Sequence, residues 1–117
     1  GLKGDSLSIF LSGAGNVTLN DLELEELTVS LSGAGEFTAS GTTMALSVTI
    51  SGFGSFDSPD LTTQTADIRI SGAGSATVRV EKSLDASISG AGSVNYYGSP
   101  SITQAISGAG DVKQIGK

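Results

Sequence analysis

The stretch Leu31-Ser32-Gly33-Ala34-Gly35-Glu36-Phe37 decides the fold of this 117-residue chain, because its centre recurs along the whole sequence. The tetrapeptide Ser-Gly-x-Gly begins at Ser12, Ser32, Ser51, Ser71, Ser89 and Ser107. Successive copies are 20, 19, 20, 18 and 18 residues apart. That period is too short for a domain. It is typical of one coil of a solenoid, in which each repeat buries its apolar face only against its neighbours.

Apolar and polar residues alternate on both sides of each tetrapeptide. The residue before each Ser is apolar in every copy, and the residues three and five before it are mostly apolar. The residue five after each Ser is also apolar: Val17, Phe37, Phe56, Ala76, Val94 and Val112. A period of two with one apolar face is typical of a β-strand. We therefore predict a strand on each side of every tetrapeptide, and no helix.

These strands predict an all-β fold. We expect a single-stranded parallel β-helix of about six coils, with a corner at each tetrapeptide and a return segment closing each coil. The hand is expected to be right, because crossovers between parallel strands strongly prefer that hand. One domain covers residues 1–117, with coils at roughly 6–26, 27–45, 46–65, 66–83, 84–101 and 102–117. The two Pro-containing stretches, 58–60 and 98–100, predict turns within the return segments.

Glycine is concentrated at the predicted corners. Twelve of the 17 glycines belong to the tetrapeptides: Gly13, Gly15, Gly33, Gly35, Gly52, Gly54, Gly72, Gly74, Gly90, Gly92, Gly108 and Gly110. We expect them to permit positive φ and a close approach between successive coils. The residue between each pair is Ala, except for Phe53. It is expected to be a small inward plug at the corner.

The composition excludes several functional classes. The chain has no His and no Cys, which removes Ser-His-Asp triads, Cys nucleophiles and zinc sites. Its net charge of −6 disfavours nucleic acid and anionic lipid surfaces as partners. No apolar run approaches the roughly 20 residues of a membrane helix, so this segment is not expected to insert into a membrane. We predict a protein that is not an enzyme and that uses no cofactor and no metal.

The beginning of the chain carries no export signal. The sequence opens on Gly1 in place of a Met, and neither a basic start nor an apolar segment follows. We therefore expect a trimmed or mature fragment, with an export signal and earlier coils lying outside it.

Asp67, Arg69 and Asp85 are the candidate ligand-contact residues. Both Asp residues lie four positions before a tetrapeptide, so they are expected to be neighbours in one outward column. Parallel β-helix polysaccharide lyases use such carboxylates to hold Ca²⁺, with an Arg as base, and Arg79 lies on the next strand. The favoured interpretation is simpler. Arg69 neutralises both carboxylates on an exposed ladder, a contact worth roughly 0.2–1 kcal/mol.

Acidic, aromatic and hydroxyl residues provide further candidate contact sites. The acidic residues Glu23, Glu25, Glu26 and Glu36 indicate a solvated loop, with a weak cation site as the alternative. Phe10 occupies an outward column and is the best candidate for an exposed sugar-binding platform, whereas Tyr96 and Phe53 are expected in the core. Two outward ladders run through all six coils and are mostly neutral. They are Ser8, Thr28, Ser47, Asp67, Asp85 and Thr103, and Thr18, Thr38, Asp57, Thr77, Asn95 and Lys113.

The repeated unit also resembles a known family. The pattern apolar-Ser-Gly-x-Gly-x-apolar, seen in 31–37 and 88–94, is similar to the bacterial family called putative auto-transporter adhesin, head GIN domain. The resemblance covers about residues 6 to 115. It implies a right-handed parallel β-helix, export to the envelope of Gram-negative bacteria and an adhesive role. It implies no catalytic residues, because the shared motif is a turn.

From these observations we predict a non-catalytic binding module of the bacterial cell envelope, either periplasmic, on the outer surface or secreted. Its expected partners are a glycan, a host or cell-surface protein, or a copy of itself in a homo-oligomer. The alternatives are a polysaccharide-active β-helix enzyme that uses Asp67, Arg69 and Asp85, and a purely structural spacer.

Overall fold

Parallel strands account for nearly all of the described chain. The structure is a computed structural model that describes residues 3–116, apart from the side chain of Lys3. The strands are β1 Lys3–Leu11, β2 Asn16–Leu31, β3 Glu36–Ile50, β4 Ser55–Ile70, β5 Ser75–Ile88, β6 Ser93–Tyr97, β7 Ser101–Ile106 and β8 Asp111–Gly116. Every strand pair is parallel, and each tetrapeptide lies between two strands.

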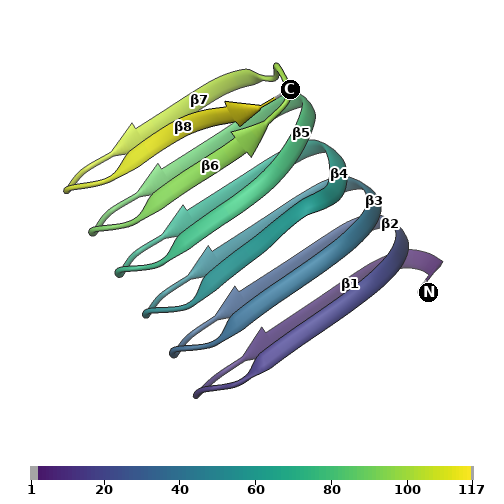
Figure 1. The fold of residues 1–117 in the computed structure, drawn as a ribbon, viewed down its shortest axis with the longest axis horizontal. Coiled ribbons are helices and arrows are strands. Elements are labelled where there is room, and N and C mark those ends of the chain that lie inside the picture. The colour runs from purple at the N-terminus through teal and green to yellow at the C-terminus, as the bar shows by residue number, and fades with distance from the viewer. Residues whose placement is uncertain (1–2, 117) are drawn as a thin grey trace.

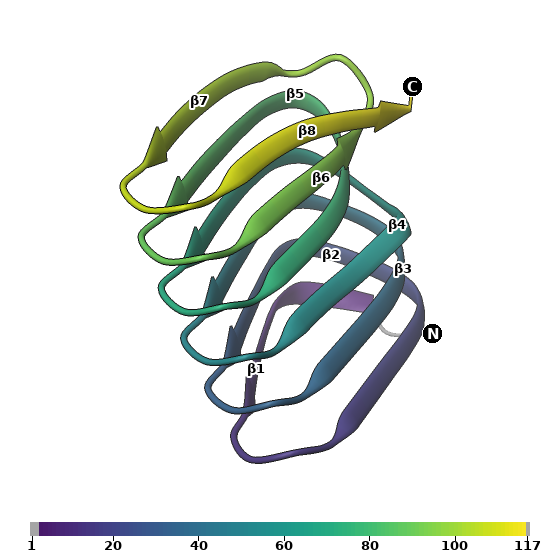
Figure 2. The same ribbon diagram turned by 60° about the vertical axis from the view of Figure 1, so that its left-hand side comes forward.

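The strands stack in chain order. The order is β1-β2-β3-β4-β5-β6-β8, and β7 pairs with β5 beside β6. Figures 1 and 2 show the result as a stack of open coils, with β1 at one end and β8 at the other. The predicted all-β parallel solenoid of about six turns is confirmed, and no helix occurs within residues 3–116.

Each long strand bends twice, so one coil has three straight stretches. In β2 the outward and inward residues alternate except at two points, where Asn20 and Asp21 and then Glu25 and Glu26 are exposed in succession. Asp21 has a φ of 57° at the first of these bends. We call the three outward surfaces the post-turn face, the return face and the pre-turn face. In β2 they comprise residues 16–20, 21–25 and 26–31.

The interior is filled by columns of apolar side chains in register. One column contains Leu27, Leu46, Ala66 and Leu84, all buried. The aromatic pair Phe37 and Phe56 stacks in another, with ring centroids 5.1 Å apart. The end coils are less covered: Leu7 and Ile102 are only partly buried. The core is therefore continuous along the axis. Each coil adds one residue to each column, as expected for a repeat that packs only on its neighbours.

Close stacking explains the tetrapeptide glycines. A β-carbon placed on Gly33 would lie 2.4 Å from the carbonyl oxygen of Gly13, and Ala34 N donates to that same oxygen at 3.0 Å. The equivalent β-carbon on Gly52 would lie 2.7 Å from the oxygen of Gly33. Among the twelve tetrapeptide glycines only Gly13 has a positive φ, 97°. The approach of one backbone to the next excludes a side chain here, and positive φ contributes at one position only.

The expectation that the central residue of the tetrapeptide plugs the corner was wrong. This residue is exposed in all six copies, and Phe53 is 75% exposed. The strand period of two continues through the tetrapeptide, so the position two after the Ser points outward like the Ser itself. In the copies after the first, a β-carbon on the first glycine would meet the backbone of the preceding coil, and one on the second would also meet an inward apolar side chain.

Of the two Pro-containing stretches, one behaves as predicted. Residues 98–100 separate β6 from β7. Residues 58–60 lie inside β4 instead, at a point where the register with β5 shifts between Asp57 and Thr62. The buried Ser58 holds this segment in the stack, because its hydroxyl donates to the carbonyl of Thr77 at 3.0 Å.

Candidate functional surfaces

The predicted charged residues lie together on the pre-turn face. Asp67 is in register with Asp85, and Arg69 lies two residues further along β4. The Nε atom of Arg69 is 3.9 Å from Oδ1 of Asp67, and the two side chains are 72% and 46% exposed. A hollow of about 180 Å³ beside them is also lined by Ser47 and Thr49. The structure therefore brings Asp67 and Arg69 together, with Asp85 in the next coil.

This cluster is an open surface feature. An ion pair at 3.9 Å between exposed side chains contributes about 0–1 kcal/mol to stability. Arg79, the other Arg of the alternative enzyme hypothesis, pairs in register with Thr62 of the return face and so belongs to a different surface. The cluster can offer a carboxylate, a guanidinium and the hydroxyls of neighbouring coils to a ligand that lies flat against the pre-turn face.

Both outward ladders are continuous in register. Thr18 pairs with Thr38, which pairs with Asp57, and the ladder continues through the remaining coils to Lys113. The second ladder runs from Ser8 to Thr103 without a break in register. Two rows of polar side chains, with hydroxyls at three of six positions on the post-turn face and four of six on the pre-turn face, therefore run along the solenoid.

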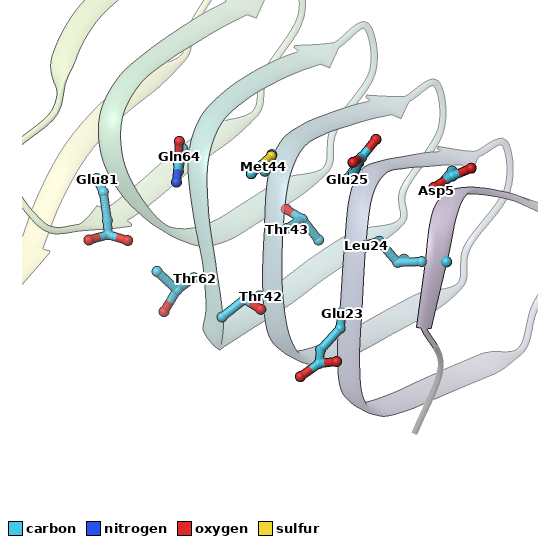
Figure 3. Close-up of a pocket in the computed structure, with 11 residues that line it drawn as sticks. Asp5, Glu23, Leu24, Glu25, Thr42, Thr43, Met44, Thr62, Gln64 and Glu81 are labelled. Atoms are coloured by element: carbon cyan, nitrogen blue, oxygen red, sulfur yellow. The ribbon is translucent and has the colours of Figure 1, made fainter.

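A larger hollow lies on the return face, where the sequence indicated only an acidic loop. We call it the return-face groove. Its volume is about 550 Å³, and it is lined by Gly4, Asp5, Glu23, Leu24, Glu25, Thr42, Thr43, Met44, Thr62, Gln64 and Glu81. These residues come from the five strands β1 to β5. Figure 3 shows them in two rows, with Glu23, Thr42 and Thr62 in one and Asp5, Glu25 and Met44 in the other.

The two rows follow from strand geometry. Residues two positions apart on a strand point to the same side, and the residue between them points to the other. Glu23 and Glu25 flank Leu24 in β2, and Thr42 and Met44 flank Thr43 in β3. The register pairs Glu23 with Thr42 and Leu24 with Thr43, so each row is continued by the next coil.

A second hollow continues the groove toward the C-terminal coils. It has a volume of about 500 Å³ and shares Thr62 and Glu81 with the return-face groove. Arg79 lines it. Its Nε donates to the carbonyl of Pro59 at 3.0 Å, and its guanidinium carbon is 4.9 Å from the centre of the Tyr97 ring. These contacts fix a cation just beyond the groove.

The acidic residues singled out in the sequence do not form one site. Glu23 and Glu25 line the groove, whereas Glu36 begins β3 next to a tetrapeptide. Across residues 3–116 no group of three or more His, Cys, Asp or Glu side chains is arranged to hold a metal ion.

The exposed apolar residues fall on different surfaces. Phe10 is 79% exposed on the pre-turn face, where the sequence placed it. Tyr96 packs against the core, as expected, while Phe53 stands at the outer edge of a tetrapeptide. Met44 is 56% exposed in the return-face groove. Counting back from the following Ser would have aligned Met44 with Glu25 and Gln64, each of which lies seven residues before a tetrapeptide.

Sequence comparison places the chain in a family. The family described as "Putative auto-transporter adhesin, head GIN domain" matches residues 1–100. The chain belongs to this family. Comparison with the curated proteins returns no match.

Three solved structures, from Parabacteroides and Bacteroides species, are similar in fold to this chain. A putative lipid binding protein from Parabacteroides distasonis ATCC 8503 is 32% identical over 97% of this chain, with a TM-score of 0.94. A putative adhesin from Bacteroides fragilis NCTC 9343 is 28% identical over 96% of the chain, with a TM-score of 0.85. A putative adhesin from Parabacteroides merdae ATCC 43184 is 25% identical over 97%, with a TM-score of 0.94.

The chain spans about half of these structures: 46%, 54% and 48% of their respective lengths. The family and two of these three structures are described as putative adhesins, and an adhesin-like family suggests a location at the cell surface or envelope. Within residues 3–116 no helix is long and apolar enough to cross a membrane.

Proposed function

We propose that this chain is a non-catalytic binding module of the bacterial cell envelope with an adhesin-like role. The observation that carries the proposal is the pair of outward ladders, which remain in register through the stack. A continuous core holds these rows flat, so a ligand that contacts several coils at once meets a surface that is already ordered. A preformed surface reduces the conformational entropy lost on binding.

The location follows from the same features. The outward positions are mostly Ser, Thr and Asn, and charged residues make up only 15% of the chain. A neutral, hydroxyl-rich surface is more usual in exported β proteins than in cytosolic enzymes. Family membership supports the same location. We propose the periplasm, the outer surface or the medium as the place where the module works.

The proposed partners are a glycan or a cell-surface protein, and a second copy of the chain is a further candidate. The test is to screen the purified chain against immobilised glycans and host surface proteins, with light scattering to establish its oligomeric state. Saturable binding to one class supports the proposal. A folded chain that binds no member of either panel and remains a monomer in solution would identify a structural spacer instead.

A further inference from the structure

We propose that the return-face groove binds a neutral, unbranched oligosaccharide that lies parallel to the solenoid axis. The inference rests on the proposed binding role, and it adds to the two ladders a third surface with one chemical class of ligand. It is carried by the shape of the groove, by the mixture of polar groups along its two rows and by the exposed Met44.

The groove has the shape of a track along the axis. Its lining comes from β1 to β5, so it crosses four steps between coils. At about 4.8 Å for each step the track is about 19 Å long. A sugar ring in an extended chain is comparable in length to one such step. Successive rings can therefore meet successive coils, and β2, β3 and β4 each supply one residue to each row.

The polar groups on the rows suit sugar hydroxyls, which both donate and accept hydrogen bonds. Glu25 and Glu81 offer carboxylate oxygens, Thr42 and Thr62 offer hydroxyls, and Gln64 offers an amide. Carboxylates accept charge-assisted bonds that are about twice as strong as neutral ones. The hydroxyls and the amide provide both donors and acceptors between the acidic positions.

Met44 gives the track an apolar contact near its centre. It is 56% exposed, and Glu25 and Gln64 occupy the neighbouring coils in the same row. A thioether side chain is flexible and polarisable, so it adapts to an apolar surface laid against it. The C–H face of a sugar ring is such a surface. Binding sites commonly combine an apolar contact with a few polar groups that fix orientation.

The charge of the groove selects against acidic glycans. Four of the described lining residues are Asp or Glu, and no Lys or Arg occurs among those described. Uronic acid or sulfate groups would meet like charges, which costs binding energy and creates specificity. Arg79, on β5 with Glu81 and in register with Thr62, is bound to the Pro59 carbonyl and lies over Tyr97. A basic peptide is the competing occupant. It would rely on exposed ion pairs of about 0–1 kcal/mol each and would leave the hydroxyl and amide positions unused.

The experiment measures binding of soluble chitin oligosaccharides of increasing length by NMR titration and calorimetry. Oligogalacturonides serve as the acidic probe and oligolysine as the basic peptide probe. We expect affinity for the neutral probe to increase with length and to level off once it spans the groove. Met44→Ala and Glu25→Gln should each weaken it by about tenfold, the equivalent of about 1.4 kcal/mol. Both residues are exposed, so unchanged melting temperatures would show that these variants fold.

Glu36→Gln and Phe53→Ala, both exposed and outside the groove, are the matched controls and should bind normally. If Asp67→Asn and Arg69→Gln on the pre-turn face lose binding while the groove variants keep it, the inference fails and the proposed function stands. Tighter binding of oligolysine, or of oligogalacturonides, also overturns the inference. If all three probes fail but a surface protein or another glycan binds through the ladders, the groove assignment is wrong and the function survives. Failure of every partner rejects both.

Discussion

The ring of Phe37 stacks on the ring of Phe56 in the next coil, with centroids 5.1 Å apart and planes 10° from parallel. This separation is close to the ~4.8 Å between adjacent strands, so the rings are stacked at the spacing of the backbone. Both side chains are fully buried. In the adjoining coils Phe37 is in register with Val17 and Phe56 with Ala76. The two rings therefore fill a column whose next members are smaller side chains.

We predict that Phe56→Ala lowers the free energy of unfolding by about 3–5 kcal/mol, because it removes a buried ring and leaves a cavity. Phe53→Ala is the matched control. Its side chain is 75% exposed, so the change should remain within about 0.5 kcal/mol. Urea denaturation of both variants provides the measurement. Equal destabilisation by the two substitutions would contradict the described packing.

Gly33→Ala should destabilise the fold by more than about 1 kcal/mol, because the new methyl group would meet the backbone of Gly13 at 2.4 Å. Gly4→Ala provides the comparison, since a β-carbon there has no atom within 4 Å and φ is not positive. Its effect on the melting temperature should be small. If Gly33→Ala melts like the parent protein, the close stacking of these two glycines is incorrect.

Two threonines in one inward column should respond oppositely to the same change. Thr43 and Thr63 are in register and buried. The Thr63 hydroxyl donates to the carbonyl of Thr65 at 2.8 Å, whereas the Thr43 hydroxyl has no hydrogen-bond partner among the described residues. Thr63→Val should therefore cost about 1 kcal/mol, and Thr43→Val should be neutral or stabilising. Chemical denaturation of the pair decides this, and the reverse order would rule out the assigned hydrogen bonding.

No lyase or hydrolase activity on neutral or acidic polysaccharides is expected, with or without Ca²⁺. The groups proposed for the enzyme alternative, Asp67, Arg69 and Asp85, lie on an open face beside a hollow of about 180 Å³. Reducing-end and unsaturated-product assays provide the test. Turnover that disappears in Asp67→Asn and Asp85→Asn would instead establish the enzyme alternative.

The sequence predicted the parts of the fold that lie near the tetrapeptides. Counting from each Ser gives the correct inward columns, such as Leu27 with Leu46, because the residues between them and the tetrapeptide are equal in number in every coil. The same counting places Asp67 beside Asp85. The same period of two, continued through the tetrapeptide, places Phe53 outward. The expected inward plug departs from that period by one residue, and a shift of one residue reverses the side of the strand.

The return-face groove was harder to predict. The register shifts between Leu19 and Leu22 and again between Asp57 and Thr62, so residues beyond these points no longer align when counted from the Ser. Such irregularities insert residues into one strand but not its neighbour, and they bend the strand locally. Counting backward does align the row, because Asp5, Glu25, Met44 and Gln64 each lie seven residues before the Ser of the next tetrapeptide, and only Glu81, eight before Ser89, departs from the count.

The ladder of hydrogen bonds also determines how this molecule would respond to tension. Bonds such as Ala34 N to Gly13 O join one coil to the next, and β1 and β8 lie at opposite ends of the stack. A force that separates those ends concentrates on the hydrogen bonds of one terminal coil. Coils of 18 to 20 residues would then peel off in sequence. At ~3.3–3.6 Å per residue, each would lengthen the chain by about 60–70 Å. In a protein that tethers a cell to a surface, such stepwise lengthening would limit the peak force on the attachment.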